Sequence, residues 1–236
     1  MSTREPDIPR DAVACSEPIP GRGGSRIPRW LKLLYTAFLA VLIPYYLWAW
    51  GPTNFLYFCD IALLMTLVAL WTEESLWASM PAVGIVLPQA LWCVDFLAGL
   101  IGRRVTGMSA YMFNPTVSLF TRSLSFFHFW LPFLVVFVVW KLGYDRRAFA
   151  AWTVLALSLM LVCYFLMPAP PPPADNPNLP VNINYVYGMS DEQPQHWMHP
   201  LAYLALMMCT FPVAIFLPTH LLLAKLFAPG RRKDEG

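Results

Sequence analysis

Six apolar stretches constrain this chain more than any other feature of its sequence. They are residues 30–50, 54–71, 76–101, 118–140, 148–167 and 200–227. About twenty apolar residues in a helix cross the roughly 30 Å hydrocarbon core of a bilayer. Only 13% of the residues are charged, whereas about a quarter are charged in a soluble domain. We therefore expect an all-α, polytopic transmembrane helical bundle of about six spans. Prolines at 81, 88, 212 and 218 predict kinks or re-entrant pieces in the third and sixth spans.

The distribution of basic residues predicts how the bundle is oriented. With the N-terminus inside, 13 of the 16 Lys and Arg residues lie on the inner side, and only Arg103, Arg104 and Arg122 lie toward the outside. Basic residues concentrate in cytoplasmic loops, so we expect both termini to be cytoplasmic. The near-balanced net charge of +2 gives no field suited to nucleic acid. The expected partners are membrane lipids, in a cell membrane.

Composition divides the chain into a central bundle and two tails. Residues 1–28 are rich in Pro, Gly, Ser and Arg, a pattern typical of a disordered cytoplasmic tail. The bundle is expected over 29–227, followed by a short cytoplasmic tail over 228–236. Its largest outer loop, 168–199, starts with a proline run that favours a stiff polyproline spacer. The amide and aromatic side chains that follow suit a lid on the membrane surface, which makes Asn182, Asn184 and Tyr185 candidate substrate-binding residues.

Ionisable residues inside the spans are the first candidates for function, because they cost free energy in a bilayer and face the bundle interior. Here they are Asp60, Asp95, Arg122 and His128. Counted at about 1.5 Å per residue, all four lie in the outer half, with Asp60 about 9 Å below the outer end of its span. Ser125 shares one polar helix face with Arg122 and His128. We take Arg122, Asp95 and Ser125 as candidate substrate-binding residues.

Two interpretations of these polar groups remain open. Asp60, Asp95 and Arg122 fit a buried ion-pair cluster that joins helices, with Arg122 paired to Asp60 or Asp95. His128 fits either a helix-to-helix hydrogen bond or a catalytic base near the midplane. Cys59 is either an inert packing residue or a nucleophile activated from the fourth span.

No metal or cofactor is expected. The H-x-x-H pair formed by His196 and His199, with Asp191 and Glu192 nearby, is the one pattern that suggests a metal ligand set. Such a pair alone is a weak signal, and a solvated loop explains it more simply.

Three patches of sequence carry a family resemblance: 55–64 (FLYFCDIALL), 123–132 (SLSFFHFWLP), and 182–188 (NINYVYG) followed by 200–203 (PLAY). Together they resemble the YwaF-like bacterial integral membrane proteins. That family is similar to an animal transmembrane acyltransferase that moves acyl chains between phospholipids, and to the androgen-induced intramembrane fatty-ester hydrolases. The resemblance implies that Cys59 is the nucleophile and His128 the base of an acyl transfer, and we add Asp60 to this candidate catalytic set.

The leading functional hypothesis is thus an intramembrane hydrolase or acyltransferase that takes an acyl lipid from the outer leaflet. A small-molecule transporter or receptor is the first alternative, because intramembrane Asp, Arg and His also build substrate and proton sites. A non-catalytic membrane scaffold is the second.

Overall fold

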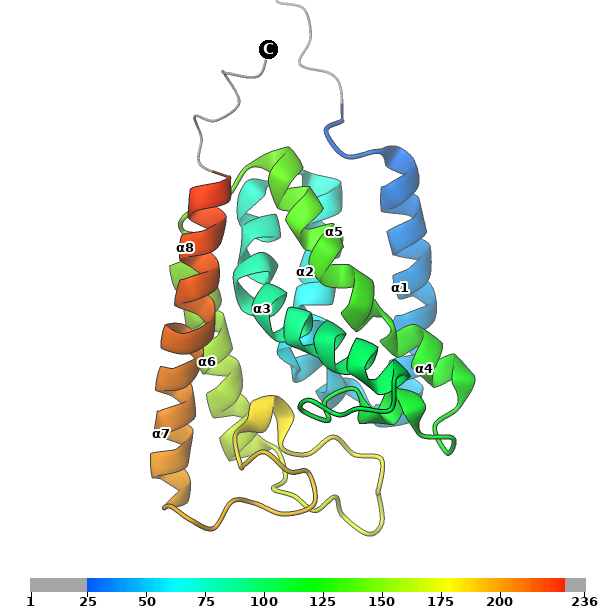
Figure 1. Ribbon diagram of the computed structural model, residues 1–236, viewed down its shortest axis with the longest axis vertical. Coiled ribbons are helices and arrows are strands. Elements are labelled where there is room, and N and C mark those ends of the chain that lie inside the picture. Colours follow the sequence, from blue (N-terminus) through cyan, green and yellow to red (C-terminus); the bar gives the residue numbers. More distant parts are fainter. Residues whose placement is uncertain (1–24, 228–236) are drawn as a thin grey trace, which may run out of the picture.

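The computed structural model describes residues 25–227, which form a bundle of helices without any strand in that part of the chain (Figure 1). The helices are α1 (Arg29–Trp50), α2 (Phe58–Thr72), α3 (Ser75–Leu100), α4 (Leu119–Ser125), α5 (Phe127–Leu142), α6 (Ala148–Leu166), α7 (Pro200–Thr210) and α8 (Leu217–Leu226). Short 3₁₀ turns, η1 (Pro52–Leu56), η2 (Ala110–Phe113) and η3 (Ile183–Tyr185), lie in the connections, and a π-helical turn, η4 (Phe211–Phe216), joins α7 to α8.

Five helical segments within 25–227 are long and apolar enough to cross a membrane: α1, α3, α4 with α5, α6, and α7 through α8. The sixth, α2, is apolar but has 15 residues, about 22 Å of helix. The predicted polytopic helical bundle is therefore confirmed, and the chain is a multi-pass membrane protein. The predicted third and sixth spans are both continuous helical segments.

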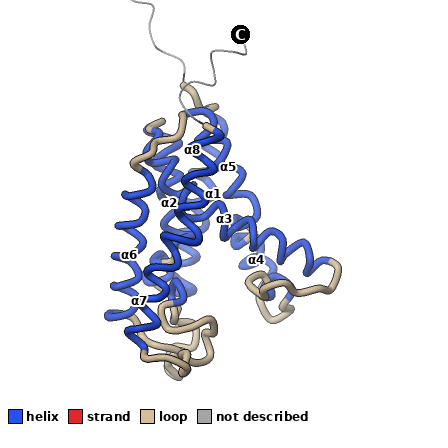
Figure 2. The backbone as a smooth tube through the Cα atoms, turned by 60° about the vertical axis from the view of Figure 1, so that its left-hand side comes forward, coloured by secondary structure: helices blue, strands red, loops and turns tan. Residues whose placement is uncertain are grey.

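Helix α3 is the centre of the bundle and packs against α2, α5, α6 and α8. Gly84 allows α6 to approach α3 closely, because a Cβ at this position would lie 1.9 Å from the Trp152 ring. Pro81 and Pro88 lie inside α3, and each removes a helix hydrogen bond. Beyond them, the end of α3 and the short α4 lean away from α6 and α7, which gives the molecule two limbs at one end (Figure 2).

The first described residues and the end of α8 lie at the same end of the bundle, and the 101–118 and 168–199 loops lie at the other (Figure 1). This arrangement agrees with an even number of crossings. The predicted cytoplasmic location of both tails concerns 1–24 and 228–236, which lie outside the described residues.

Residues 25–28 correct the predicted boundary of the N-terminal tail. Ile27 is fully buried, and the Glu73 carboxylate accepts hydrogen bonds from the Ser25 hydroxyl, the Arg26 backbone N–H at 2.8 Å and the Lys32 ammonium at 2.6 Å. Desolvation acts to raise the pKa of Glu73, but these hydrogen bonds outweigh it and lower the pKa to about 2. The segment 25–28 is therefore fixed to the bundle and is not a disordered tail.

The orientation can be tested with single cysteines in a background without other cysteines. Asp175 and Arg146 are both exposed, in loops at opposite ends of the bundle. We expect an impermeant maleimide to label Asp175→Cys on intact cells and to label Arg146→Cys only after permeabilisation, because the basic residues place the 143–147 loop inside. The reverse pattern would contradict the orientation.

Candidate functional site: a polar cavity at the loop end of the bundle

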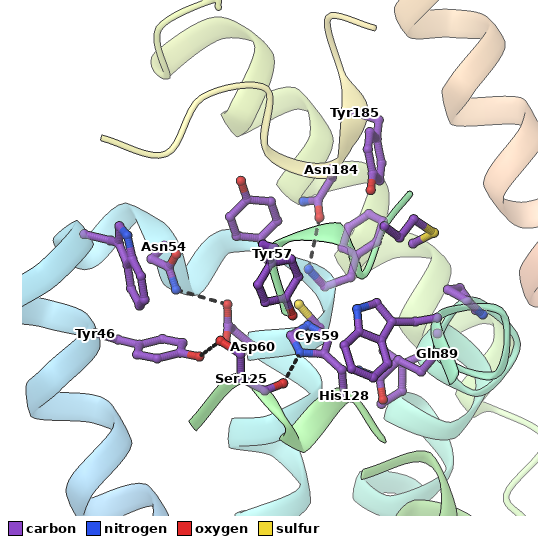
Figure 3. Close-up of a pocket in the computed structure, with 18 of the residues that line it drawn as sticks. Tyr46, Asn54, Tyr57, Cys59, Asp60, Gln89, Ser125, His128, Asn184 and Tyr185 are labelled. Carbon is purple, nitrogen blue, oxygen red and sulfur yellow. Dashed lines mark hydrogen bonds between the residues drawn. The ribbon is translucent and has the colours of Figure 1, made fainter. Parts of the chain in front are cut away.

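A cavity of about 500 Å³ lies at the end of the bundle that carries the long loops. One of its walls comes from α3, α4 and the 101–118 loop, and the facing wall comes from η3 and the π-helical turn. It therefore lies between the two limbs seen in Figure 2. Its floor includes Cys59 and Asp60 of α2 and His128 of α5 (Figure 3). Three of the predicted ionisable or nucleophilic side chains thus share one cavity.

The start of α2 is fixed by a residue far away in the sequence. No side chain of the preceding segment caps the helix. Instead, the Asn184 side-chain oxygen accepts a hydrogen bond from the Phe58 backbone N–H at 3.0 Å, and its amide nitrogen donates to the Leu56 carbonyl at 2.9 Å (Figure 3). A free N–H group at a helix start needs such an acceptor. The 168–199 loop therefore fixes the position of Cys59 and Asp60.

Asp60 lies in the first turn of α2 and not several residues inside a span, because η1 occupies the segment before it. The predicted depth of about 9 Å down a helix is therefore wrong. One carboxylate oxygen accepts a hydrogen bond from the Asn54 amide at 3.2 Å, whereas Oδ1 is buried without a partner in the described part of the chain. A helix N-terminus favours negative charge in its first turn.

His128 follows a break in the fourth predicted span. Helix α4 ends at Ser125 and α5 starts at Phe127, and the Phe129 N–H bonds to the Phe126 carbonyl at 3.0 Å. The Ser125 carbonyl thus lacks its usual helical partner and pairs with Nδ1 of His128 at 2.8 Å (Figure 3). A carbonyl can only accept, so Nδ1 carries the proton, and Nε2 presents a lone pair.

Two aromatic side chains stack on the His128 ring. The ring stacks on Phe127 with centroids 4.0 Å apart and on Trp92 at 5.5 Å. Pro132 cannot donate to the His128 carbonyl, and the Cys93 thiol approaches the carbonyls of His128 and Phe129 at 3.8 and 3.6 Å. Backbone and ring are both oriented, as a general base requires.

The Cys59 side chain projects into the same cavity (Figure 3). Among the described residues, no hydrogen bond links its sulfur to His128. Ser125 lines the cavity too, with its hydroxyl 3.1 Å from the Tyr46 hydroxyl. The geometry thus brings together the predicted nucleophile, base and one polar contact, without joining them in a hydrogen-bonded chain.

Asp95 is not part of this cavity, contrary to its prediction as a substrate-binding residue. Its Oδ1 accepts hydrogen bonds from the backbone N–H groups of Val105, Thr106 and Gly107 at 2.7–3.0 Å. Its Oδ2 accepts from the Ser109 N–H at 2.9 Å and hydroxyl at 2.7 Å. Five donors saturate the carboxylate. Asp95 therefore organises the 101–118 loop.

Arg122 forms neither of the ion pairs that the sequence predicted for it. The ion pairs within 25–227 are Lys32 with Glu73 and Arg147 with Asp145, both at the opposite end of the bundle. Arg122 donates to the Met112 carbonyl at 3.1 Å and does not line the cavity. The predicted pairing of Arg122 with Asp60 or Asp95 is wrong, because backbone groups of the loop satisfy Asp95 and hold Arg122.

The three predicted loop residues divide into two kinds. Asn182 is buried outside the cavity lining, and its amide holds the loop together through the Gly188 carbonyl at 2.9 Å and the Tyr187 N–H at 2.8 Å. Asn184 borders the cavity, but its amide caps α2 as described. Tyr185 lines the cavity, and burial raises the pKa of its phenol. We therefore keep Tyr185 as a substrate-contact candidate and assign the two asparagines to loop structure.

Several cavity groups were not predicted from the sequence. Gln89 and Trp92 of α3 lie one turn apart, are each 3% exposed and line the cavity. Asp191 lies at the rim, where desolvation raises its pKa against a hydrogen bond from Asn182. The spacing of three between Gln89 and Trp92 places both on one helix face, and this was the available signal.

The described residues contain no group of three or more His, Cys, Asp or Glu side chains with the geometry of a metal site. His196 and His199 lie exposed in the 168–199 loop.

Fold and cavity together define a multi-pass helical membrane protein with a polar cavity at one end of the bundle. No family model, curated protein or solved structure matches the chain.

Proposed function

We propose that this protein is a membrane-embedded hydrolase or acyltransferase that acts on an acyl lipid from the outer leaflet of a bacterial cytoplasmic membrane. The observation that carries the proposal is the shared cavity of Cys59, Asp60 and His128, in which the His128 tautomer leaves Nε2 free. A thiol with a base available is the minimum for covalent acyl transfer. The resemblance to YwaF-like proteins supports the same chemistry.

The shape of the site suits an amphiphile. The cavity wall combines polar side chains with Ile85, Pro88, Val117 and Phe211, and it lies between the two limbs. A cavity of a few hundred cubic ångströms or more with a mainly apolar wall and few polar groups is typical of small-ligand sites. We propose that the acyl chain enters between the limbs from the lipid and that Tyr185 contacts the lipid at the loop side.

The proposed reaction has two halves. His128 Nε2 takes the proton of the Cys59 thiol, and the thiolate attacks the ester carbonyl carbon. The ester C–O bond breaks, the leaving alcohol takes the proton from the His128 imidazolium, and the acyl group remains on Cys59 as a thioester. Water or the hydroxyl of a second lipid then attacks the thioester, with its proton passing through His128 to the released sulfur. In the hydrolysis branch, Asp60 Oδ1, which lacks a partner, accepts a hydrogen bond from the second hydrogen of the attacking water.

Trapping the acyl group on Cys59 tests the proposal. Purified protein in nanodiscs is mixed with fluorescent acyl phospholipids, and turnover is measured together with the intact mass after rapid acid quench. We expect an acyl adduct that disappears in Cys59→Ser, with turnover lower by about 100-fold or more. The matched control is Cys209→Ser, because Cys209 is exposed on α7.

Each other outcome has a distinct meaning. If Cys59→Ser retains full turnover and no acyl adduct forms, the reaction proceeds by direct attack of water on the ester and not through a thioester. If folded wild-type protein turns over no lipid of a broad panel, the enzyme hypothesis is contradicted, and the receptor, transporter and scaffold hypotheses remain.

A further inference from the structure

Two polar side chains in the cavity lack partners that burial normally demands. Both side-chain atoms of Gln89 and the indole N–H of Trp92 are buried without a hydrogen bond to any residue in 25–227. Leaving a buried donor or acceptor unpaired destabilises the folded protein, because the group loses its hydrogen bonds to water without replacement. Both residues line the proposed catalytic cavity, where a bound ligand can supply the missing hydrogen-bond partners (Gln89 is labelled in Figure 3).

The location of Gln89 is set by the shape of α3. It follows Pro88, at the point where α3 begins to lean away from the rest of the bundle. In Figure 3 its amide enters the cavity on the side of His128, across from Tyr46 and Asn54. Trp92, one turn further, stacks on His128 and lines the same cavity, with its N–H buried and unpaired among the described residues. The helix thus presents two N–H donors and one amide oxygen beside the proposed base.

The charges of the cavity restrict what these groups can bind. The ionisable side chains in the described lining include Asp60, Asp191 and His128, but no Lys or Arg. An anionic group would therefore meet carboxylates without a cation to pair with it. An uncharged carbonyl oxygen, in contrast, accepts from the Gln89 and Trp92 N–H groups, and a neighbouring hydroxyl donates to the Gln89 amide oxygen.

We propose that Gln89 and Trp92 bind the ester carbonyl of the acyl lipid, with a free hydroxyl next to that ester as the partner of the Gln89 oxygen. The proposal rests on the proposed function, and it adds the recognition element that Cys59 and His128 lack. Gln89 and Trp92 contact the substrate directly in the bound state. During attack the same two N–H groups stabilise the negative charge that develops on the carbonyl oxygen.

A pair of non-cleavable ligands tests the carbonyl contact without turnover. One is a medium-chain monoacylglycerol analogue in which a methylene replaces the ester oxygen, leaving a ketone. The other is the corresponding alkyl ether, which lacks the carbonyl. We expect wild-type protein in nanodiscs to bind the ketone about 10-fold tighter than the ether, because only the ketone satisfies the buried donors. Equal affinities would overturn the proposal.

Gln89→Met provides the second test, with Gln193→Met in the exposed part of the outer loop as matched control. Methionine has nearly the same shape as glutamine, so this change removes an unpaired amide. We expect the melting temperature of ligand-free protein to rise by about 2 °C and the preference for the ketone to vanish. The control should change neither quantity. Trp92→Phe, which keeps the ring stack, should lower the preference partially.

The outcomes separate this proposal from the proposed function. If the protein prefers the ketone but turns over no acyl lipid, the proposed enzymatic function is refuted and the proposed carbonyl-binding site is supported. If the protein turns over acyl lipid but binds ketone and ether equally, the proposed enzymatic function is supported and the carbonyl-binding role of Gln89 is refuted. A Gln89→Met protein that melts lower or fails to fold would show that the amide serves the fold, and would also refute the proposal.

Discussion

Replacing His128 with glutamine is expected to lower acyl-lipid turnover by about 100-fold or more while the protein stays folded. Glutamine preserves much of the size of the ring, and its amide can still donate to the Ser125 carbonyl, which is the contact that Nδ1 makes now. It cannot accept a proton at neutral pH. The melting temperature should therefore change by only a few degrees, whereas the proton transfer from the thiol or from water is lost.

The control for this experiment is His199→Gln, because His199 is exposed at the end of the 168–199 loop. Turnover of the control should equal that of wild type. The rapid-quench assay adds a second readout, since His128→Gln should also slow formation of the Cys59 acyl adduct. If His128→Gln retains full turnover, the ring serves only to join Ser125 to the start of α5, and the catalytic interpretation fails.

The helices themselves could be predicted closely from hydropathy. The predicted ends agree within about one residue with those of α1, α3, α6 and the α7–α8 segment. A long apolar segment in a bilayer must satisfy its backbone hydrogen bonds internally, and it therefore forms a helix. The interruptions could not be predicted. The 3₁₀ turn overlaps the start of the predicted second span, and the break at Phe126 lies inside the predicted fourth span. Their hydrogen bonds depend on Asn184 and on neighbouring backbone groups, which hydropathy does not report.

The site was predictable where a residue stands out from its apolar surroundings. Cys59, Asp60, Ser125 and His128 do so, and all of them line the cavity. Gln89 does not stand out in the same way, because one neutral amide beside a proline hardly changes a hydropathy profile. It becomes informative only once its burial and lack of a partner are known.

Pairing was the least predictable property of the charged residues. Opposite charges at similar depth suggested an ion pair for Arg122, but the backbone N–H groups of 105–109 are equally good partners for a carboxylate. Those donors are the same in every sequence, so composition cannot reveal them. The consequence is a changed role for Asp95: it shapes the wall of the cavity, since the loop it holds presents Met108 and Tyr111 to the interior.

Asp95→Asn is accordingly expected to be among the most destabilising substitutions at the loop end of the bundle. Hydrogen bonds to a charged acceptor contribute about 1.5–3 kcal/mol each, and the Asn side chain replaces one acceptor oxygen by an N–H donor that faces the Ser109 donors or the 105–107 amides. The loss should reach about 3 kcal/mol or more, seen as a lower melting temperature in detergent.

Asp145→Asn is the matched control, because Asp145 pairs with the exposed Arg147 in a loop at the other end of the bundle, where an ion pair contributes little to stability. Proteolysis supplies the local readout. Cleavage after Arg103 or Arg104, both exposed beside the Asp95 carboxylate, should become faster in Asp95→Asn, because the loop then opens without unfolding the whole bundle. Unchanged melting and unchanged cleavage would mean that the 101–118 loop keeps its shape without the carboxylate. The wall formed by Met108 and Tyr111 would then have to be held from the α4 side.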